Sequence, residues 1–371
     1  IRLRRDWGGC YMIYVKAEDL KVGMRLARPI YNRNGTLLYG RNDKITKQGI
    51  TSVKNFGLIG LYILEPAEPL PPMSEEEMEF ERFQTMEVFS LKEDLDAIMK
   101  DNQPINLMRQ TDDVVRQFGN LYHRIHFNQN LRSTEDYVYK HDLNVAILAA
   151  LISHRAKFGI MEQTEVVVAA LLHDLGKLSL PAKLRGKAED LSEEEMNTVA
   201  RAVIVGVDKI SDAFNLPMGV KGTLMQFCQL QYLPDKAPDK ISKLVKVLMV
   251  ANAYDEYTAM QLDQNPHSEV EAIRMLQSRP DIYDKSMVKH LLDSIMVLYP
   301  GVCVELTNHE KGLVLNENDR DILRPVVLGF THNEIYNLDR DEIFEDIQIK
   351  DIMKTMDNRI KVDQDRLKEY M

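Results

Sequence analysis

The sequence predicts a mainly α protein, in which a helical bundle follows a small N-terminal α+β module and precedes a short C-terminal β-appendix. Three observations lead to this fold class. Apolar positions recur at helical spacing from about residue 75 to residue 298. Two segments there, 141–152 and 166–172, are apolar almost all round, which is typical of helices buried at the centre of a bundle. Short apolar runs bounded by turn residues come before and after this stretch.

The first eleven residues do not resemble a folded element. They carry Arg, Gly and the single Trp, Trp7, without periodicity. The basic start is not followed by the apolar segment of a signal peptide. We therefore expect Met12 to be the natural start and residues 1–11 to be a non-native or mis-started leader. Mass spectrometry of the native protein tests this expectation.

Residues 12–66 are expected to form the small α+β module. Asn34-Gly35 lies between two apolar runs and indicates a hairpin, because both residues tolerate positive φ. Residues 45–56 read as a short helix that ends at Gly57, and residues 58–64 read as a closing strand.

Residues 67–80 are expected to be a linker, because prolines stiffen the chain and a run of Glu follows them. Ser74 and Glu77 have the spacing of a capping box, so a helix should begin there. A second box at Ser192 and Glu195 marks a helix inside the bundle, which we assign to residues 81–298. Gly119 and Gly176 stand where helix stops are expected.

The pattern changes after Tyr299-Pro300-Gly301. Alternating residues in 302–306, followed by the runs 313–315 and 325–328, predict three short strands. We assign residues 299–350 to this β-appendix. Residues 351–371 read as a charged tail.

Composition excludes several classes of protein. The 371 residues contain 47 Lys and Arg against 57 Asp and Glu, a formal charge of −10, which argues against a protein that coats a nucleic-acid polymer. No apolar run approaches the roughly 18 residues of a membrane span. Cys10, Cys228 and Cys303 are far apart, which excludes a disulfide framework and favours a reducing cytoplasm.

The chemistry concentrates in the segment 171–177, Leu-Leu-His-Asp-Leu-Gly-Lys. A buried helix should end at His173 and Asp174, and His141 opens the other buried helix. Two imidazoles and a carboxylate on neighbouring helices can begin a divalent metal site. Lys177 would lie beside the metal and could contact a phosphate. The alternative is structural, because a His-Asp pair can satisfy itself by hydrogen bonding.

His141 together with the downstream segment LLHDLGKLSLP resembles the HD superfamily of metal-dependent phosphohydrolases. In detail the sequence resembles the HD-GYP branch, bacterial phosphodiesterases that open cyclic di-GMP. The resemblance covers roughly residues 16–350 and implies an HD-type helical bundle with a two-metal site. The segments that match in the family's order are YVYKHDLNVAILAAL, LSEEEMNTVARAVIVG, VLMVANAYDEYTA, YPGVCVELTNHEKGLVLNEN and RPVVL.

The sequence departs from the family at most of the remaining metal-ligand positions. Ala202 stands where the family has His, and Phe227-Cys228-Gln229 replaces its His-His-Glu. The Gly-Tyr-Pro loop is reduced to Tyr232 and Pro234 in a shortened segment. Asn252 replaces the final Asp, and Asp255, one turn later, matches a family Asp that we expect to be structural. A thiolate at Cys228 could still bind metal.

These losses predict a non-catalytic regulatory or binding module in signal transduction. Its partners would be a cyclic dinucleotide, a protein of a signalling pathway and a second copy in a homodimer. The alternative is a metal-dependent phosphohydrolase or phosphodiesterase with a reduced one-metal site. That site would hold one divalent metal of the Fe, Mn or Zn class, or none if only a packed remnant is left. Its ligands would be His141, His173, Asp174 and Asn252, with Asp174 and Lys177 catalytic and Lys177 and Arg201 contacting substrate.

Overall fold

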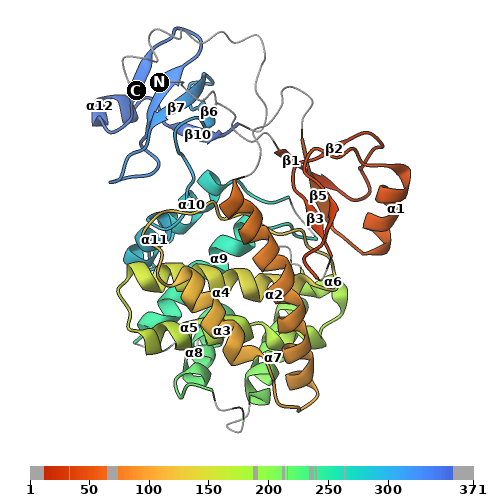
Figure 1. The fold of residues 1–371 in the computed structure, drawn as a ribbon. Coiled ribbons are helices and arrows are strands. Elements are labelled where there is room, and N and C mark those ends of the chain that lie inside the picture. Colours follow the sequence, from red (N-terminus) through yellow and green to blue (C-terminus); the bar gives the residue numbers. More distant parts are fainter. Residues whose placement is uncertain are drawn as a thin grey trace.

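The computed structural model confirms the mainly α fold and shows where the two small β regions lie (Figure 1). It describes residues 12–32, 34–64, 74–186, 191–210, 214, 216–233, 238, 240–262 and 265–353. The expected leader, residues 67–73 of the expected linker, Pro234 and residues 354–371 of the expected tail lie outside the described residues. No helix among the described residues is long and apolar enough to cross a membrane.

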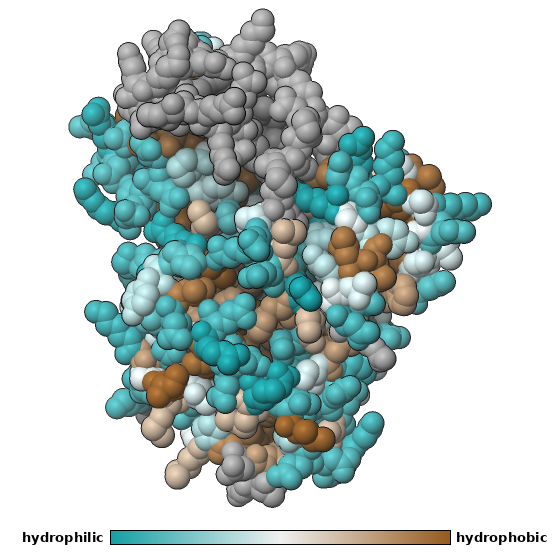
Figure 2. Space-filling view, viewed as in Figure 1, coloured by the Kyte–Doolittle hydropathy of each residue, from teal (hydrophilic) through white to brown (hydrophobic). Residues whose placement is uncertain are grey.

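The central body is helical, and its two innermost helices are the ones expected from their apolar sequence. Helix α4 packs along α5, and α9 packs against both. Hydrophilic side chains cover much of the visible face of this body, with scattered hydrophobic patches (Figure 2). The helices are α2 (Glu75–Met99), α3 (Leu107–Phe118), α4 (Tyr137–Arg155), α5 (Ile160–Leu172), α6 (Ala182–Arg185), α7 (Glu193–Lys209), α8 (Val220–Tyr232), α9 (Lys243–Thr258), α10 (Glu269–Ser278) and α11 (Lys285–Leu292), with the 3₁₀ turn η1 (Leu175–Ser179).

Both predicted capping boxes are confirmed. The Ser74 hydroxyl accepts from the Glu77 amide, and the Glu77 carboxylate accepts from the Ser74 amide at 2.8 Å. Ser192 and Glu195 make the same reciprocal pair at the start of α7. These bonds satisfy amide groups that the first turn of a helix leaves unpaired.

The N-terminal part is an antiparallel sheet with one helix and a separate hairpin. Strand β5 (Gly60–Leu64) lies between β1 (Met12–Lys16) and β2 (Arg25–Leu26), so the predicted closing strand is the central one. The hairpin predicted at Asn34-Gly35 joins β3 (Ile30–Tyr31) to β4 (Leu37–Tyr39). Helix α1 (Lys47–Asn55) completes this part, and Gly57 follows it with positive φ.

The C-terminal sheet is larger than the sequence predicted. The three expected strands are β6 (Cys303–Leu306), β7 (Lys311–Asn316) and β8 (Val326–Gly329). Strand β9 (Ile335–Asn337) pairs with β8, and β10 (Ile349–Ile352) pairs with β6, while α12 (Asp341–Phe344) lies between them in sequence. Residues 351 and 352 are therefore part of the sheet, not of a charged tail, because pairing with β6 satisfies their backbone.

Gly176 has a different role from the expected helix stop, whereas Gly119 does end α3. Helix α5 ends one residue before His173, and Gly176 lies inside η1. A Cβ on Gly176 would be 1.9 Å from the carbonyl oxygen of Ala202, and one on Gly206 would be 2.3 Å from the Gly176 amide nitrogen. The two glycines therefore allow η1 to approach the backbone of α7 directly.

Candidate metal centre

The structure brings the four expected ligands together in the helical core. His141 lies in the second turn of α4, His173 and Asp174 follow α5 directly, and Asn252 lies on α9. The Nε2 atoms of His141 and His173 are 3.1 Å apart. The Asn252 Oδ1 atom is 3.0 Å from the first and 3.1 Å from the second. Asp174 Oδ2 is 3.5 Å from His141 Nε2, and all four side chains are almost wholly buried.

The outer nitrogens of both imidazoles are occupied, so the inner nitrogens present lone pairs. His141 Nδ1 donates to Asp255 Oδ2 at 2.6 Å, and His173 Nδ1 donates to the carbonyl oxygen of Ala170 at 2.7 Å. Burial lowers the pKa of His173 to about 4, because it outweighs the opposing charge of Asp174 and is reinforced by the neighbouring His141. A neutral His173 has the protonation state that metal binding requires.

This donor set fits a divalent cation. Two imidazole nitrogens, a carboxylate and an amide oxygen converge without a proton between them, and such sets suit Zn, Fe or Mn. A rotation of the Asn252 amide by 180° would instead direct its NH₂ group at both imidazoles and satisfy them without metal. The fit is supported by Asp174 Oδ1, which has no hydrogen-bond partner among the described residues.

Lys177 contacts the carboxylate of the centre. Its ammonium group is 2.6 Å from Asp174 Oδ2. Burial alone would raise the pKa of Asp174, but Lys177 and the two imidazoles hold it at about 2. Arg201, the other expected substrate contact, is exposed on α7, and no described contact joins it to the centre.

Three residues that the family resemblance aligns with ligands of a second metal, Ala202, Phe227 and Cys228, are buried among apolar side chains. Phe227 packs edge-to-face against His173, with ring centroids 5.3 Å apart. Ala202 and Cys228 belong to a buried apolar cluster with Leu180, Leu184, Val199 and Val203. Burial raises the pKa of Cys228 to about 11, helped by the charge of Asp174, so this side chain is a neutral thiol at pH 7. A thiolate ligand at Cys228 is therefore disfavoured.

A buried polar network contacts His141 on the Nδ1 side of its ring. Asp255 accepts from His141 and from Arg132 at 2.6 Å each, and burial is outweighed by these partners, which hold the pKa of Asp255 well below its usual range. Gln129 and Asn144 donate to its other oxygen at 3.0 and 2.9 Å. The structural role expected for Asp255 agrees with this geometry. Partners of this kind fix the orientation of a metal-binding imidazole.

Asp142 is a residue of the site that the sequence analysis did not identify. It is fully buried, and neither of its carboxylate oxygens has a hydrogen-bond partner among the described residues. Its Oδ1 atom is 3.4 Å from His173 Nδ1, and His141, Asp142, His173 and Asp174 form a group that could hold a metal ion. Burial and the charge of Asp174 raise its pKa well above the usual value. The signal was present, because His-Asp-Leu occurs at 141–143 as well as at 173–175.

Comparison with known proteins finds similarity to one protein domain and to two characterised relatives. Residues 126–287 match the model of the HD domain. The cyclic di-GMP phosphodiesterase PA4108 of Pseudomonas aeruginosa is 24% identical over 204 residues, which are 54% of this chain and 49% of that protein. The cyclic di-GMP phosphodiesterase PdeB of Borreliella burgdorferi is 24% identical over 195 residues, half of each protein.

The chain thus spans about half the length of the curated relatives it matches. A solved structure, the HDG"Y"P protein Bd1817 from Bdellovibrio bacteriovorus, aligns with a TM-score of 0.44 at 15% identity. That alignment covers 76% of this chain and 98% of the other. Residues 126–287 thus match the HD domain, and the similarity to two cyclic di-GMP phosphodiesterases supports membership of the HD-GYP branch of the HD superfamily.

Proposed function

We propose that this protein is a regulatory HD-GYP module that holds one divalent cation and binds a cyclic dinucleotide without two-metal hydrolysis. The observation that carries the proposal is the contrast within one site. Four donors converge for one ion, while Phe227 and the apolar cluster of Ala202 and Cys228 stand at the expected second position.

The physical reason is that two-metal hydrolysis needs a pair of cations about 3.5–4 Å apart to activate water and stabilise the leaving oxygen. An aromatic ring, a methyl group and a neutral thiol offer such a second cation no anionic or imidazole ligand. The neutral Asn252 amide also leaves the remaining centre with one negative charge fewer than an Asp would provide. The four donors are only 1–3% exposed, so a phosphodiester has little access to them.

A one-metal phosphohydrolase is the second candidate. It is favoured by the unpartnered oxygens of Asp142 and Asp174, which place acceptor capacity beside the convergent donors. A single bound cation would supply Lewis acidity and a water of lowered pKa. In this function Asp174 and Lys177 are the catalytic residues. Lys177 would exchange its ion pair with Asp174 for a contact with a substrate phosphate, and Arg201 would have to approach from α7.

The experiment combines metal content, cyclic di-GMP binding and product analysis on the purified chain. The regulatory proposal expects one transition-metal equivalent per chain, binding of cyclic di-GMP by calorimetry and no linear dinucleotide product with added Mn²⁺ or Fe²⁺. Asp174→Asn should remove the metal, and the matched surface change Asp208→Asn on α7 should not. Metal-dependent cleavage that Asp174→Asn abolishes and Asp208→Asn leaves intact would instead establish the enzyme.

We also propose that the protein acts in the cytoplasm, in association with other protein chains. Cys228 and Cys303 are both buried, and neither forms a disulfide among the described residues, which suits the reducing cytoplasm. We further propose that it binds a protein of a signalling pathway and that it forms a homodimer. Light scattering of the purified chain with and without cyclic di-GMP tests the dimer, and a monomer under both conditions would refute it.

A further inference from the structure

The N-terminal part of the chain is bonded to the loop that lies directly before α4. We call this loop, residues 128–134, the bridging segment. The amide of Ile59 donates to the carbonyl oxygen of Arg132 at 2.8 Å. Leu131 packs against the apolar cluster of the N-terminal sheet. Backbone and side-chain contacts therefore both hold the bridging segment against the N-terminal part.

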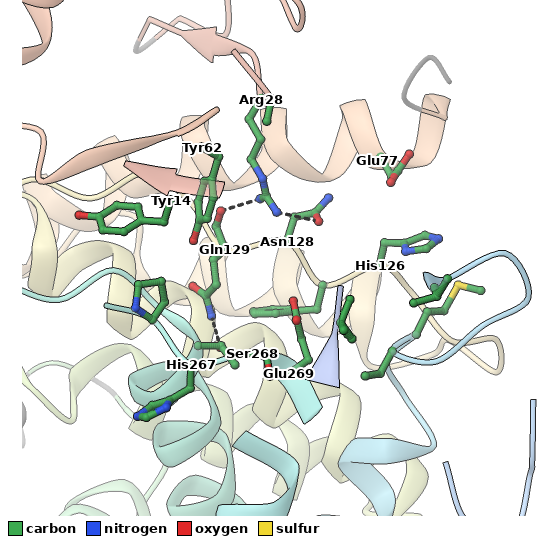
Figure 3. Close-up of a pocket in the computed structure, with 18 of the residues that line it drawn as sticks. Tyr14, Arg28, Tyr62, Glu77, His126, Asn128, Gln129, His267, Ser268 and Glu269 are labelled. Carbon is green, nitrogen blue, oxygen red and sulfur yellow. Dashed lines mark hydrogen bonds between the residues drawn. The ribbon is translucent and has the colours of Figure 1, made fainter. Parts of the chain in front are cut away.

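Arg28, two residues after β2, contacts the bridging segment with its guanidinium group. One nitrogen donates to the carbonyl oxygen of Gln129 at 2.6 Å and the other donates to Asn128 Oδ1 at 3.0 Å (Figure 3). The guanidinium lies 4.8 Å from the centre of the Tyr62 ring, and its nearest nitrogen is 3.6 Å from a carboxylate oxygen of Glu81. Because the guanidinium fork is planar and rigid, two bonds to adjacent residues fix the orientation of this stretch of chain.

Gln129 carries the connection from Arg28 towards the metal centre. Its side chain points away from Arg28 (Figure 3) and donates to Asp255 Oδ1 at 3.0 Å and to Thr258 Oγ1 at 2.8 Å. Its own amide oxygen accepts from Asn144 at 2.9 Å. The other oxygen of the same Asp255 carboxylate accepts from His141 Nδ1 at 2.6 Å. One residue therefore joins a guanidinium of the N-terminal part to the carboxylate that orients a metal-centre imidazole.

Arg132 provides a second connection from the same segment. Its carbonyl oxygen accepts from Ile59, and its guanidinium donates to Asp255 Oδ2 at 2.6 Å. Both charged side chains are fully buried, so separating them would be strongly unfavourable. The bridging segment thus contacts both oxygens of Asp255, and a displacement of the segment would also displace this carboxylate.

We propose that the N-terminal part positions His141 for metal binding and that Arg28 is the positioning residue. Arg28 fixes the bridging segment, the segment fixes Asp255, and Asp255 keeps the His141 proton on Nδ1 so that Nε2 is free for an ion. Metal affinity thereby depends on the docking of the N-terminal part. This consequence rests on the one-metal centre proposed above, whereas the orientation of the imidazole is a property of the metal-free protein as well.

The first measurement is nitrogen-15 NMR of the His141 ring in the metal-free full chain. The wild type should show a single tautomer with its proton on Nδ1. Arg28→Met removes both donors and keeps the apolar stem, and it should give a mixture of tautomers. Arg25→Met is the matched control, because Arg25 is exposed on β2 and donates to Asn42 within the N-terminal part. The control should keep the wild-type signal.

The second measurement is the affinity for Mn²⁺, by calorimetry, in a double-mutant cycle. Gln129→Met keeps the carbonyl group that Arg28 contacts but removes the side-chain link to Asp255. Each single variant should weaken Mn²⁺ binding about tenfold, as the loss of a group that supports a metal ligand commonly does. The double variant should bind little worse than either, because both changes break the same connection, whereas independent effects would multiply to about 100-fold.

The positioning role is overturned if Arg28→Met folds and keeps the wild-type His141 signal, or if the two losses of affinity multiply. If Arg28→Met does not fold, Arg28→Lys decides on the same two measurements. It keeps the positive charge beside Glu81 but replaces the planar fork with a single nitrogen, so it should cause the same changes at smaller size, and no change would overturn the role. A wild type that binds no Mn²⁺ would refute the one-metal centre alone, and the imidazole signal would then decide the positioning role.

Discussion

Replacing Asn252 by Asp tests whether the convergent donors hold a metal. The change returns a negative charge to a point 3.0 and 3.1 Å from two imidazole nitrogens. For a dication and a carboxylate about 3 Å apart, an effective dielectric of 20 gives a gross attraction of about 10 kcal/mol. Desolvation of the new carboxylate and repulsion from Asp174 remove most of this. We expect a net gain near 3 kcal/mol, or about 100-fold in affinity for Mn²⁺.

The effect of Asn252→Asp on stability should change sign when metal is added, whereas a variant that only disturbs packing should destabilise the protein with or without metal. With a chelator present, two buried carboxylates face each other, and the variant should melt several degrees below the wild type. With saturating Mn²⁺ it should melt above the wild type, because a ligand that binds only the folded state stabilises it. Differential scanning calorimetry in both conditions measures this reversal.

Asn144→Asp is the matched control for this experiment. Asn144 is equally buried and donates to Asp255 one helical turn after His141, but its amide does not face the inner nitrogens. The same amide-to-carboxylate change there should destabilise the protein with and without Mn²⁺. If Asn252→Asp behaves in the same way, with no gain in metal affinity, the cluster is a packed remnant and the one-metal centre is refuted.

Three further predictions concern packing and charge. Gly176→Ala should destabilise the protein by about 3 kcal/mol or more, because its Cβ would overlap the backbone of α7. The control Gly222→Ala has open space around the site and should be neutral or stabilising. Equal melting temperatures for the two variants would contradict the argument from close contact. Because the folded-state pKa of Glu81 is raised from 4.5 to about 7, the folded protein binds the extra proton between these values. Stability should therefore fall by up to about 3 kcal/mol as pH rises through that window, and urea titrations of Glu81→Gln should show a flatter profile. Arg132→Leu should cost about 3–5 kcal/mol in urea unfolding, because it leaves the fully buried Asp255 carboxylate without its guanidinium; a loss below 1 kcal/mol would show that the ion pair is dispensable.

The metal-centre residues show which parts of the site a local sequence pattern can predict. His141, His173 and Asp174 were identified from their position on apolar helices, because a polar pair inside an all-round apolar segment is a local signal. Asn252 could be aligned with the family but not judged, since its contribution depends on a contact with His141 across 111 positions of chain. Asp142 was missed because it reads as one charged residue on a helix, whereas the packing of α4 buries its carboxylate with no hydrogen bond among the described residues.

The sequence by itself determined the helical body, the capping boxes at Ser74 and Ser192 and the hairpin at Asn34-Gly35. Each of these follows from residue type and spacing within one turn or one motif. Tertiary structure alone decided that β10 completes the C-terminal sheet and that Gly176 allows a close backbone contact with α7. These features depend on which elements, distant in sequence, pack against each other. The periodicity of a sequence predicts which face of an element is buried, but it does not predict the element against which that face packs.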